Sequence, residues 1–401
     1  MTEMSAENKK LDLKGNGHER SNFYEFFLTP TITAIFLHRY TDIRVMSSNS
    51  RGIIFSSVDI KTNIPVAIKY LNHTFESAEL AKHTYREISL LLKANHKNIV
   101  QMVNLLSPQI CVGSSQKNFD VYIVLEKVSH TLTHVINLAR VGKNILTHKH
   151  ISFIVYQILC AVKYLHDSNI MHRDLKPDNI GVNDRGCVVK LLDFGLSRAE
   201  THHVKHSPYV VTRFYRAPEI VLGINYTKKV DVWSIGCVLA EMLLKKPMFP
   251  GEHYFLQWNT IVRVLGKPGG AFLNRLEGKT REYALSAGPQ SGIRMEELFP
   301  EKTCSFPGDQ EPLNLQHAID FMRKILVIDD TDRYDVCQAL EHVYVSYWKN
   351  DSETNVTPIA LEEMLSDEEL IKDTEMSVES YRSKIENQLV EYKRDHDVYH
   401  G

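Results

Sequence analysis

Lys69 and Glu87 have the residue types and the spacing of a buried ion pair. Lys69 ends the run Val66-Ala67-Ile68-Lys69, which predicts a strand, and Glu87 lies 18 residues further on, in a helical pattern over 79–94. Either residue alone is most often an exposed charge. Together with the motifs described next, they favour a lysine that a carboxylate holds in place and presents to phosphate groups.

Acidic and amide side chains gather in short motifs further along the chain. One motif is HRDLKPDN at 172–179, directly after a long apolar stretch; a second is DFG at 193–195, after the strand-like run VVKLL; a third is APE at 217–219. Transfer of a phosphoryl group requires mainly positioning and charge neutralisation, which carboxylates, an amide and a lysine supply. Each motif is weak by itself, whereas all three in this order are specific.

The elements that must position these residues change in character near Glu126. Short β-rich runs recur from Phe36 to Glu126 and predict an antiparallel sheet, interrupted by the helix at 79–94. Beyond them, apolar residues over 151–165 cover nearly the whole circumference of a helix, which predicts a buried helix. Further helical runs lie at 231–244, 253–265 and 315–326. The fold class is therefore α+β and bilobal, with a small β-rich N-lobe, a larger α-helical C-lobe and a ligand cleft between them.

Composition excludes several classes of protein. The chain has 401 residues with Lys+Arg 47 against Asp+Glu 49, so it is not a basic protein held to nucleic acid by phosphate contacts. We found no apolar stretch of membrane-spanning length, and the N-terminus lacks the apolar block of a signal peptide. The six cysteines lie far apart and the 19 histidines form no zinc motif, which favours a reducing, intracellular setting.

The motifs resemble those of eukaryotic protein kinases. Ser207-Pro208-Tyr209, followed by VVTRFYRAPE, is similar to the dual-phosphorylation loop of mitogen-activated protein (MAP) kinases, and the central proline points to the c-Jun N-terminal kinase (JNK) group. The stretches 21–24, 85–109, 249–268 and 376–393 also look like JNK. The resemblance covers about residues 21 to 393, and serine at 207 is similar to divergent JNK-like kinases of nematodes.

The resemblance implies an ATP- and Mg²⁺-dependent serine/threonine kinase with defined site residues. Asp174 would accept the proton of the substrate hydroxyl, Lys176 would stabilise the transferred group, and Lys69 with Glu87 would hold the α- and β-phosphates. Asn179 and Asp193 would bind Mg²⁺. The expected nucleotide-binding residues are Met46, Ser47, Ser48, Asn49, Ser50, Arg51, Gly52, Ile53, Ile54, Ala67, Lys69, Leu125, Glu126, Val128 and Leu192.

The resemblance also implies regulation by phosphorylation. A MAP kinase kinase would phosphorylate Ser207 and Tyr209, and the enzyme would act on Ser/Thr-Pro sites. Phosphate is read by arginine, and the candidates are Arg86, Arg173 and Arg198 for Ser207, with Arg213 and Arg216 for Tyr209. The alternative is that these arginines are scattered surface charges.

A docking site for partners is expected after the last helix of the C-lobe. Trp348, Asp351 and Glu353 resemble an acidic docking rim, and Cys187 falls at the groove cysteine of JNK. Activators, substrates and phosphatases would dock there, unless the acidic residues are only a solvated face. We expect a monomer without direct nucleic-acid or membrane binding, located in the cytoplasm and able to enter the nucleus.

Two positions depart from the kinase pattern. The phosphate-covering loop should read Gly-x-Gly-x-x-Gly, but residues 47–52 read SSNSRG, and a serine in a strained backbone region would cost roughly 1 kcal/mol. Gly181 replaces the apolar residue expected under adenine. These changes predict weakened ATP binding and leave open a pseudokinase or docking scaffold. Regulation of the cyclin-dependent type is disfavoured by Tyr209 and by the insert.

The expected domain organisation has four parts. Residues 1–20 form a disordered tail, 21–127 the N-lobe, 128–350 the C-lobe with a MAP-kinase insert at about 253–300, and 351–401 an acidic C-terminal extension. Within that extension an apolar stripe should dock back on the body; it consists of Val378, Tyr381, Ile385 and Leu389.

Overall fold

The computed structural model describes residues 9–10, 22–29, 32–49, 51–111, 119–144, 146–200, 213–289, 291–360, 376–396 and 398. The chain forms two compact units. Unit 1 comprises Met1–Ala94, Val100–Val128 and Thr374–Gly401, and unit 2 comprises Asn95–Ile99 and Ser129–Asp373. The chain therefore passes between the units four times, whereas the predicted lobes at 21–127 and 128–350 imply a single crossing.

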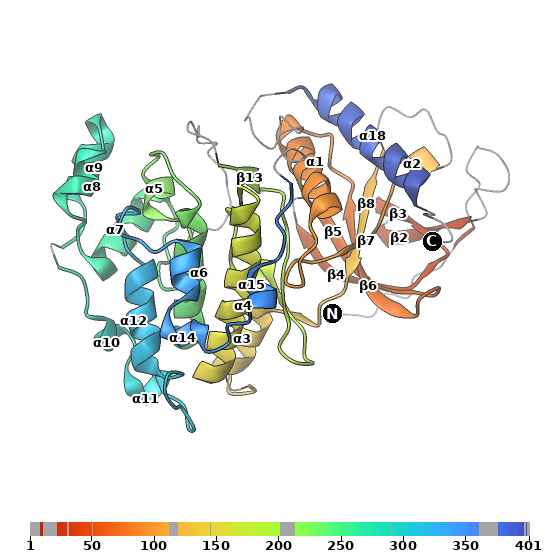
Figure 1. The fold of residues 1–401 in the computed structure, drawn as a ribbon. Helices are drawn as coiled ribbons and strands as arrows, with labels where there is room; N and C mark the ends of the chain where they lie inside the picture. The colour runs from red at the N-terminus through yellow and green to blue at the C-terminus, as the bar shows by residue number, and fades with distance from the viewer. Residues whose placement is uncertain are drawn as a thin grey trace. The chain divides into compact units, whose positions relative to one another are not determined.

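Unit 1 is built on a five-stranded antiparallel sheet in the order β4-β5-β6-β8-β7 (Figure 1). The strands are β4 (Tyr40–Asn49), β5 (Gly52–Asp59), β6 (Ile64–Leu71), β7 (Met102–Leu106) and β8 (Val121–Glu126). The helix α1 (Ala78–Lys93) begins at Ser77, whose side chain accepts a hydrogen bond from the amide of Leu80. The predicted antiparallel sheet and its interrupting helix are confirmed.

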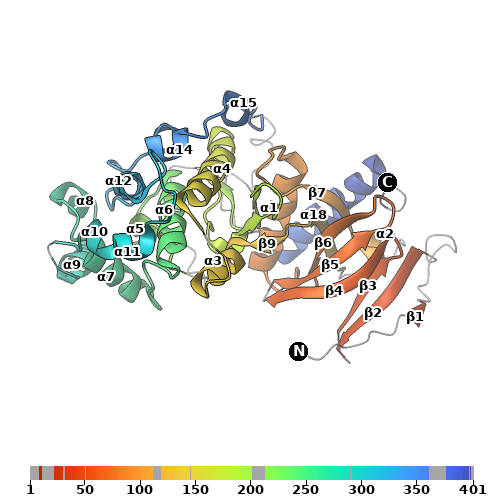
Figure 2. The ribbon, with the colours of Figure 1, turned by 90° about the horizontal axis from the view of Figure 1, so that it is seen from below.

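A β-hairpin adds a second, smaller sheet to unit 1. Strands β2 (Phe23–Thr29) and β3 (Ile32–Leu37) pair with each other, and β1 (Lys9–Lys10) pairs with the outer edge of β2 (Figure 2). Phe36 packs edge-on against Phe55 and Tyr122 of the larger sheet, with ring centroids 5.1 and 5.7 Å apart. The β-rich region thus begins at Phe23 rather than Phe36. Within the predicted tail 1–20 the structure describes Lys9 and Lys10, which form a strand; the rest of 1–20 lies outside the described residues.

The helix α18 (Val378–Asp395) belongs to unit 1 and lies along α1 (Figure 1). Of the predicted apolar stripe, Tyr381, Ile385 and Leu389 are buried and Val378 is half-buried. The same helix contacts β7 and α2 (Pro108–Cys111). Docking of this stripe, predicted from its spacing, is present.

Unit 2 is mainly helical, and its core is formed by α4 (His148–Asp167), α6 (Lys229–Leu244) and α12 (Leu315–Ile325). These helices confirm three of the predicted runs, and α7 (Tyr254–Leu265) confirms the fourth. The other helices are α3 (Leu132–Arg140), α5 (Pro218–Val221), α8 (Gly270–Asn274), α9 (Gly278–Ser286), α10 (Met295–Leu298), α11 (Glu301–Cys304), α13 (Val336–Leu340), α14 (Val343–Ser346) and α15 (Asp351–Thr354). None of the helices described is long and apolar enough to cross a membrane.

Two small sheets in unit 2 flank the motifs found in the sequence. One has the order β12-β11-β9, made of β9 (His130–Thr131), β11 (Ile180–Val182) and β12 (Val189–Leu191). The other pairs β10 (Ile170–Met171) with β13 (Arg198–Ala199). A 3₁₀ turn at Pro177–Asn179 joins the loop 172–176 to β11. Residues 172–179 and 193–197 are thereby held between short strands.

Candidate functional site

The Lys69–Glu87 ion pair is present inside unit 1. Lys69 Nζ lies 2.6 Å from each carboxylate oxygen of Glu87, and the two residues are only 8 % and 3 % exposed. Lys69 comes from β6 and Glu87 from α1, so the pair joins sheet to helix. Because removing one partner leaves a buried charge unpaired, the two side chains depend on each other.

Strand register places several of the predicted nucleotide-binding residues on the face of the sheet that carries Lys69. Ile54 is directly opposite Lys69, and Ala67, two residues before Lys69, is directly opposite Leu125. Directly paired residues, and residues two apart on one strand, point to the same face. Ile53 is opposite Tyr70 and therefore lies on the other face, away from Lys69, and its place in the nucleotide site stays a prediction.

The segment in which two of the expected glycines are missing lies at the end of the β4–β5 hairpin. Ser47, Ser48 and Asn49 belong to β4 and pair with Ile54, Ile53 and Gly52. None of these three is among the described non-glycine residues with positive φ, so the strain expected for serine at 47 is absent. Met46 falls at a register shift between Val45 and Ser47, and Ser50 lies outside the described residues.

Gly52 is the glycine of this loop that the fold requires. Its φ is +149°, and a Cβ at this position would lie 2.1 Å from the carbonyl oxygen of Tyr70. A side chain there would collide with the backbone of β6, the strand that carries Lys69. Glycine is therefore present at position 52, where a Cβ would collide with β6, and absent at positions 47 and 49, where β4 has no positive φ.

Asp174, Lys176 and Asn179 form one hydrogen-bonded cluster in unit 2. Lys176 Nζ donates to Asp174 Oδ2 over 2.7 Å, and Asn179 Nδ2 donates to the same oxygen over 2.7 Å and to the Asp174 carbonyl over 2.8 Å. All three residues are buried. Both of these side-chain hydrogen bonds to the carboxylate fall on the same oxygen, Oδ2.

Asp231, which the sequence reading did not single out, anchors this loop. Its carboxylate accepts the backbone amides of His172 and Arg173 over 2.8 Å each, and the ring of His166 over 2.9 Å. Burial alone would raise the pKa of Asp231, but the hydrogen bonds from His166 and from the backbone amide of Arg173 help to outweigh it and hold the pKa below its usual range. An acidic residue at the start of the apolar helix 231–244 is the signal that could have revealed it.

His172 joins the cluster to the DFG segment. Its Nδ1 accepts the amide of Asp174 over 3.3 Å, and its Nε2 lies 3.3 Å from the carbonyl of Leu192, a pairing that a neutral ring protonated on Nε2 satisfies. Burial lowers the pKa of His172, which favours that neutral form. Leu192 in turn donates its amide to the carbonyl of Asn179 over 2.9 Å. Leu192 and Asp193 are thus positioned by the same loop that holds Asp174.

Asp193 has a left-handed backbone, with a φ of +59°, and Arg173 has one of +68°. Phe194, directly after Asp193, is fully buried, and its ring centroid lies 5.1 Å from that of His172. Non-glycine residues with positive φ are sparse and cluster where function constrains the backbone.

Gly181, the middle residue of β11, is buried between Lys190 and Thr131.

Two of the predicted phosphate-reading arginines share one tyrosine. Arg216 donates to the Tyr254 hydroxyl over 2.7 Å, and the guanidinium of Arg213 lies 4.8 Å from the centre of the same ring. Arg173 faces the ring of Tyr226, and Arg198 is buried in β13, whereas Arg86 lies in α1 of unit 1. Ser207 and Tyr209 lie outside the described residues.

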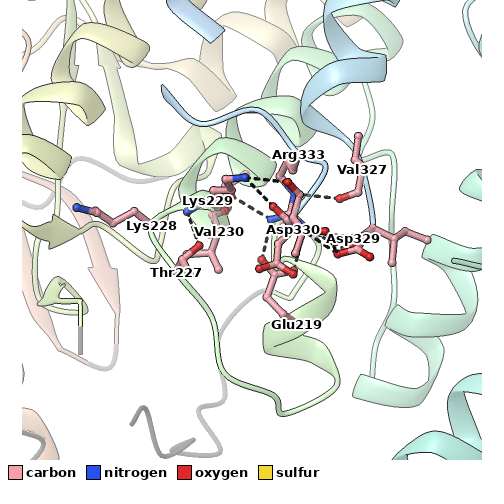
Figure 3. Close-up of polar contacts among 12 residues, drawn as sticks. Glu219, Thr227, Lys228, Lys229, Val230, Val327, Asp329, Asp330 and Arg333 are labelled. Atoms are coloured by element: carbon pink, nitrogen blue, oxygen red, sulfur yellow. Dashed lines mark hydrogen bonds and ion pairs between the residues drawn. The ribbon is translucent and has the colours of Figure 1, made fainter. Parts of the chain in front are cut away.

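Glu219 of the APE motif is held by a buried ion pair with Arg333 (Figure 3). The guanidinium donates to the two carboxylate oxygens over 2.6 and 2.9 Å, and also to the carbonyls of Val327 and Lys229. Both side chains are fully buried. Arg333 lies in a loop rich in aspartate, and its role was not apparent from the sequence.

Two of the predicted docking residues, Trp348 and Cys187, contact the first half of α4. Trp348 packs on Phe153, with ring centroids 4.8 Å apart, and donates its indole NH to Ser152. Glu353 forms an ion pair with Lys97, and Asp351 begins α15. Cys187 is half-buried, and its carbonyl accepts a hydrogen bond of 2.8 Å from Gln157, also in α4.

The donors offered by Asn179 and Asp193 suit Mg²⁺. Asn179 uses its amide nitrogen for both hydrogen bonds to Asp174, so its amide oxygen points away from Asp174 and can serve as a hard oxygen ligand. Asp193 supplies a carboxylate. Mg²⁺ prefers such oxygen donors and usually takes only one or two from protein, the rest coming from water and substrate phosphate. In the described part of the chain no group of three or more His, Cys, Asp or Glu residues could hold a metal by itself.

Comparison with known proteins relates the chain to a protein family and, among its relatives, to a nematode kinase. The family described as protein kinase domain matches residues 40–345. The stress-activated protein kinase jnk-1 of Caenorhabditis elegans is 37 % identical over 382 residues, which are 95 % of this chain and 79 % of that protein.

Proposed function

Because the chain belongs to the protein kinase family, as a serine/threonine kinase of the JNK type of MAP kinases, we propose that it transfers the γ-phosphate of ATP to Ser/Thr-Pro sites after dual phosphorylation of Ser207 and Tyr209. The observation that carries this proposal is the cluster in which Lys176 and Asn179 both bind one oxygen of Asp174. This arrangement orients a carboxylate and places a cation beside it.

Asp174 is proposed to orient the substrate hydroxyl through Oδ1. The hydroxyl oxygen attacks the γ-phosphorus, the bond to the β-bridging oxygen breaks, ADP leaves, and the hydroxyl proton passes to Asp174. Lys176, 2.7 Å from Oδ2, stabilises the negative charge on the transferred group. Lys69 binds the other phosphates, and its hydrogen bonds to Glu87 fix where its charge lies.

Asn179 and Asp193 would hold Mg²⁺ through their side-chain oxygens. When bound, Mg²⁺ would neutralise phosphate charge. The sheet face with Ile54, Ala67 and Leu125 would receive the adenine, since these residues lie on the side of Lys69. The lost glycines at 47 and 49 are compatible with ATP binding because β4 is unstrained there.

Activation would depend on arginines that bind the phosphates of the activation segment. Arg213 and Arg216, both held at Tyr254, are proposed to bind phospho-Tyr209, and Arg86, Arg173 and Arg198 phospho-Ser207. Each phosphate adds about −1.5 to −2 charges and three acceptor oxygens. A MAP kinase kinase is the proposed activator, and the region of Trp348, Asp351, Glu353 and Cys187 the proposed docking site for activators, substrates and phosphatases.

Activity on matched peptides tests the proposed reaction. Protein phosphorylated on Ser207 and Tyr209 should phosphorylate a Ser-Pro peptide much faster than the same peptide with Ser-Ala. Asp174→Ala should abolish this activity, whereas Asp184→Ala, which alters an exposed carboxylate, should retain it. Equal turnover by Asp174→Ala would contradict the proposal, and binding of docking peptides without turnover would indicate a scaffold.

The two regulatory residues need separate variants. Ser207→Ala and Tyr209→Phe, each treated with the activating kinase, should both lose most of the activity gained by the wild type. Mass spectrometry establishes which residue carries phosphate in each sample. Full activation of either variant would show that its residue is dispensable.

A further inference from the structure

The C-terminal helix α18 contacts both of the elements that the Lys69–Glu87 pair must join. Glu87 lies on α1, and Lys69 lies on β6, which is connected through β8 to β7. Within unit 1, α18 packs along α1 and also against β7 (Figure 1). Among the elements described, α18 makes the most extensive contact with α1.

The contacts with α1 lie on both sides of Glu87. Gln388 donates to the hydroxyl of Ser89 over 2.7 Å, two residues after Glu87. Tyr381, only 1 % exposed, packs near Tyr85, two residues before Glu87, with ring centroids 6.3 Å apart. Ile385 lies between these two positions on α18 and is fully buried.

The other end of α18 and the segment after it bind the sheet. The Tyr392 hydroxyl donates to the carbonyl of Val103, and Asn104 donates to the carbonyl of Val398 over 3.1 Å. Val103 and Asn104 both belong to β7. Lys393 donates to the carbonyl of Cys111, at the end of α2, over 3.0 Å.

The contacts of α18 with α1 and β7 matter because the Lys69–Glu87 ion pair cannot hold α1 in place by itself. Burying two charges costs solvation energy that their mutual attraction barely repays, so such a pair is weak support for the elements that carry it. Small displacements of catalytic groups are costly, since about 1 Å can lower the rate by a factor of about 100. The position of α1 relative to β6 must therefore be fixed by other contacts.

We propose that α18 positions Glu87, and through it Lys69, so that Tyr381, Ile385 and Gln388 are positioning residues for phosphoryl transfer. The inference rests on the proposed role of Lys69 in binding phosphate. None of the three residues belongs to the strands or loops of the proposed nucleotide site.

The experiment compares folded, activated variants in steady-state kinetics and hydrogen exchange. Ile385→Ala should lower kcat/KM for ATP about tenfold, leave KM for a Ser-Pro peptide within about twofold, and speed amide exchange over residues 78–93 but not over 315–325. Val390→Ala, which alters a half-exposed residue of the same helix, is the matched control and should behave as wild type. Lys69→Ala tests the proposed function separately: if it stays active, Lys69 is not needed whatever α18 does.

Single hydrogen-bond variants decide the matter if Ile385→Ala does not fold. Gln388→Ala and Ser89→Ala should each lower kcat/KM for ATP, and the double variant should lose no more than either alone, because one bond is shared. If Ile385→Ala does not fold, wild-type kinetics for both single variants would overturn the proposal. If Ile385→Ala folds, faster amide exchange over 78–93 together with an unchanged kcat/KM for ATP would overturn it.

Discussion

Asp231 accepts two backbone amides and a histidine ring in the interior of unit 2, and these bonds give residues 172 and 173 their conformation. Asp231→Asn replaces one acceptor oxygen by a donor facing these groups. We expect a loss of about 1–3 kcal/mol in the free energy of unfolding. We also expect a fall in kcat of about 10- to 100-fold, because the loop that carries Asp174 shifts.

Urea unfolding and peptide phosphorylation measure these two effects of Asp231→Asn. Asp184→Asn alters an exposed carboxylate of the same unit and serves as the control. A folded Asp231→Asn variant with wild-type kcat would show that the loop keeps its geometry without this anchor.

Gly52 and Ser47 should respond in opposite ways to substitution. Gly52→Ala puts a Cβ 2.1 Å from the Tyr70 carbonyl in a backbone region that favours glycine, and should destabilise the protein by about 2–4 kcal/mol. Ser47→Gly, in a part of β4 without positive φ, should cost only about 0.5–1 kcal/mol. Thermal unfolding of both variants checks the difference, and a Gly52→Ala protein as stable as wild type would contradict the geometry.

At the scale of elements, Arg333 ties α5, through Glu219, to the start of α6 and to the loop after α12. Arg333→Met leaves the Glu219 carboxylate buried and unpaired, which should cost about 3–5 kcal/mol in the free energy of unfolding. Arg294→Met removes an exposed pair with Glu297 and should leave the urea midpoint unchanged. Equal midpoints for the two variants would exclude a stabilising role for the buried pair.

The sequence predicted the elements better than the contacts between them. Strand alternation and helical periodicity predicted an antiparallel sheet, without its strand β7, together with α1, α4 and the apolar stripe of α18, since these patterns depend on which residues face a core. Arg333 could not be predicted, because a buried charge is recognised only when the residues it binds are known; for Asp231 the sequence offered a signal in its place at the start of an apolar helix, but not the groups that it binds. That Ile53 faces away from Lys69 could not be predicted either, because a one-residue step along a strand changes the face and the motif alone does not give the register.

At the scale of the whole molecule, we expect several buried histidines to make the free energy of unfolding depend on pH. Burial lowers the pKa of His96 to about 4 and also lowers the pKa values of His148 and His172. In the unfolded chain these histidines bind protons near pH 6.5, whereas in the folded protein they become protonated only at a lower pH. Stability should therefore be highest above pH 6.5 and decrease between about pH 6.5 and 4.

Urea unfolding measured from pH 8 to pH 4 checks this dependence. Each such histidine contributes a slope of up to about 1.4 kcal/mol per pH unit in this range. His96→Gln should reduce the slope by one such contribution, whatever its effect on stability at pH 8. An unchanged slope would mean that His96 is not neutral in the folded protein.

The placement of α18 in unit 1 also sets the order in which the chain can complete its structure on the ribosome. The strands of unit 1 and α1 are synthesised first, but the helix that covers α1 follows only at Val378–Asp395, after residues 129–373 of unit 2. Domains usually fold as they emerge, N-terminal first. Here the N-terminal unit must wait for the last part of the chain, so its apolar α1 surface stays exposed through most of translation and is a natural site for chaperone binding.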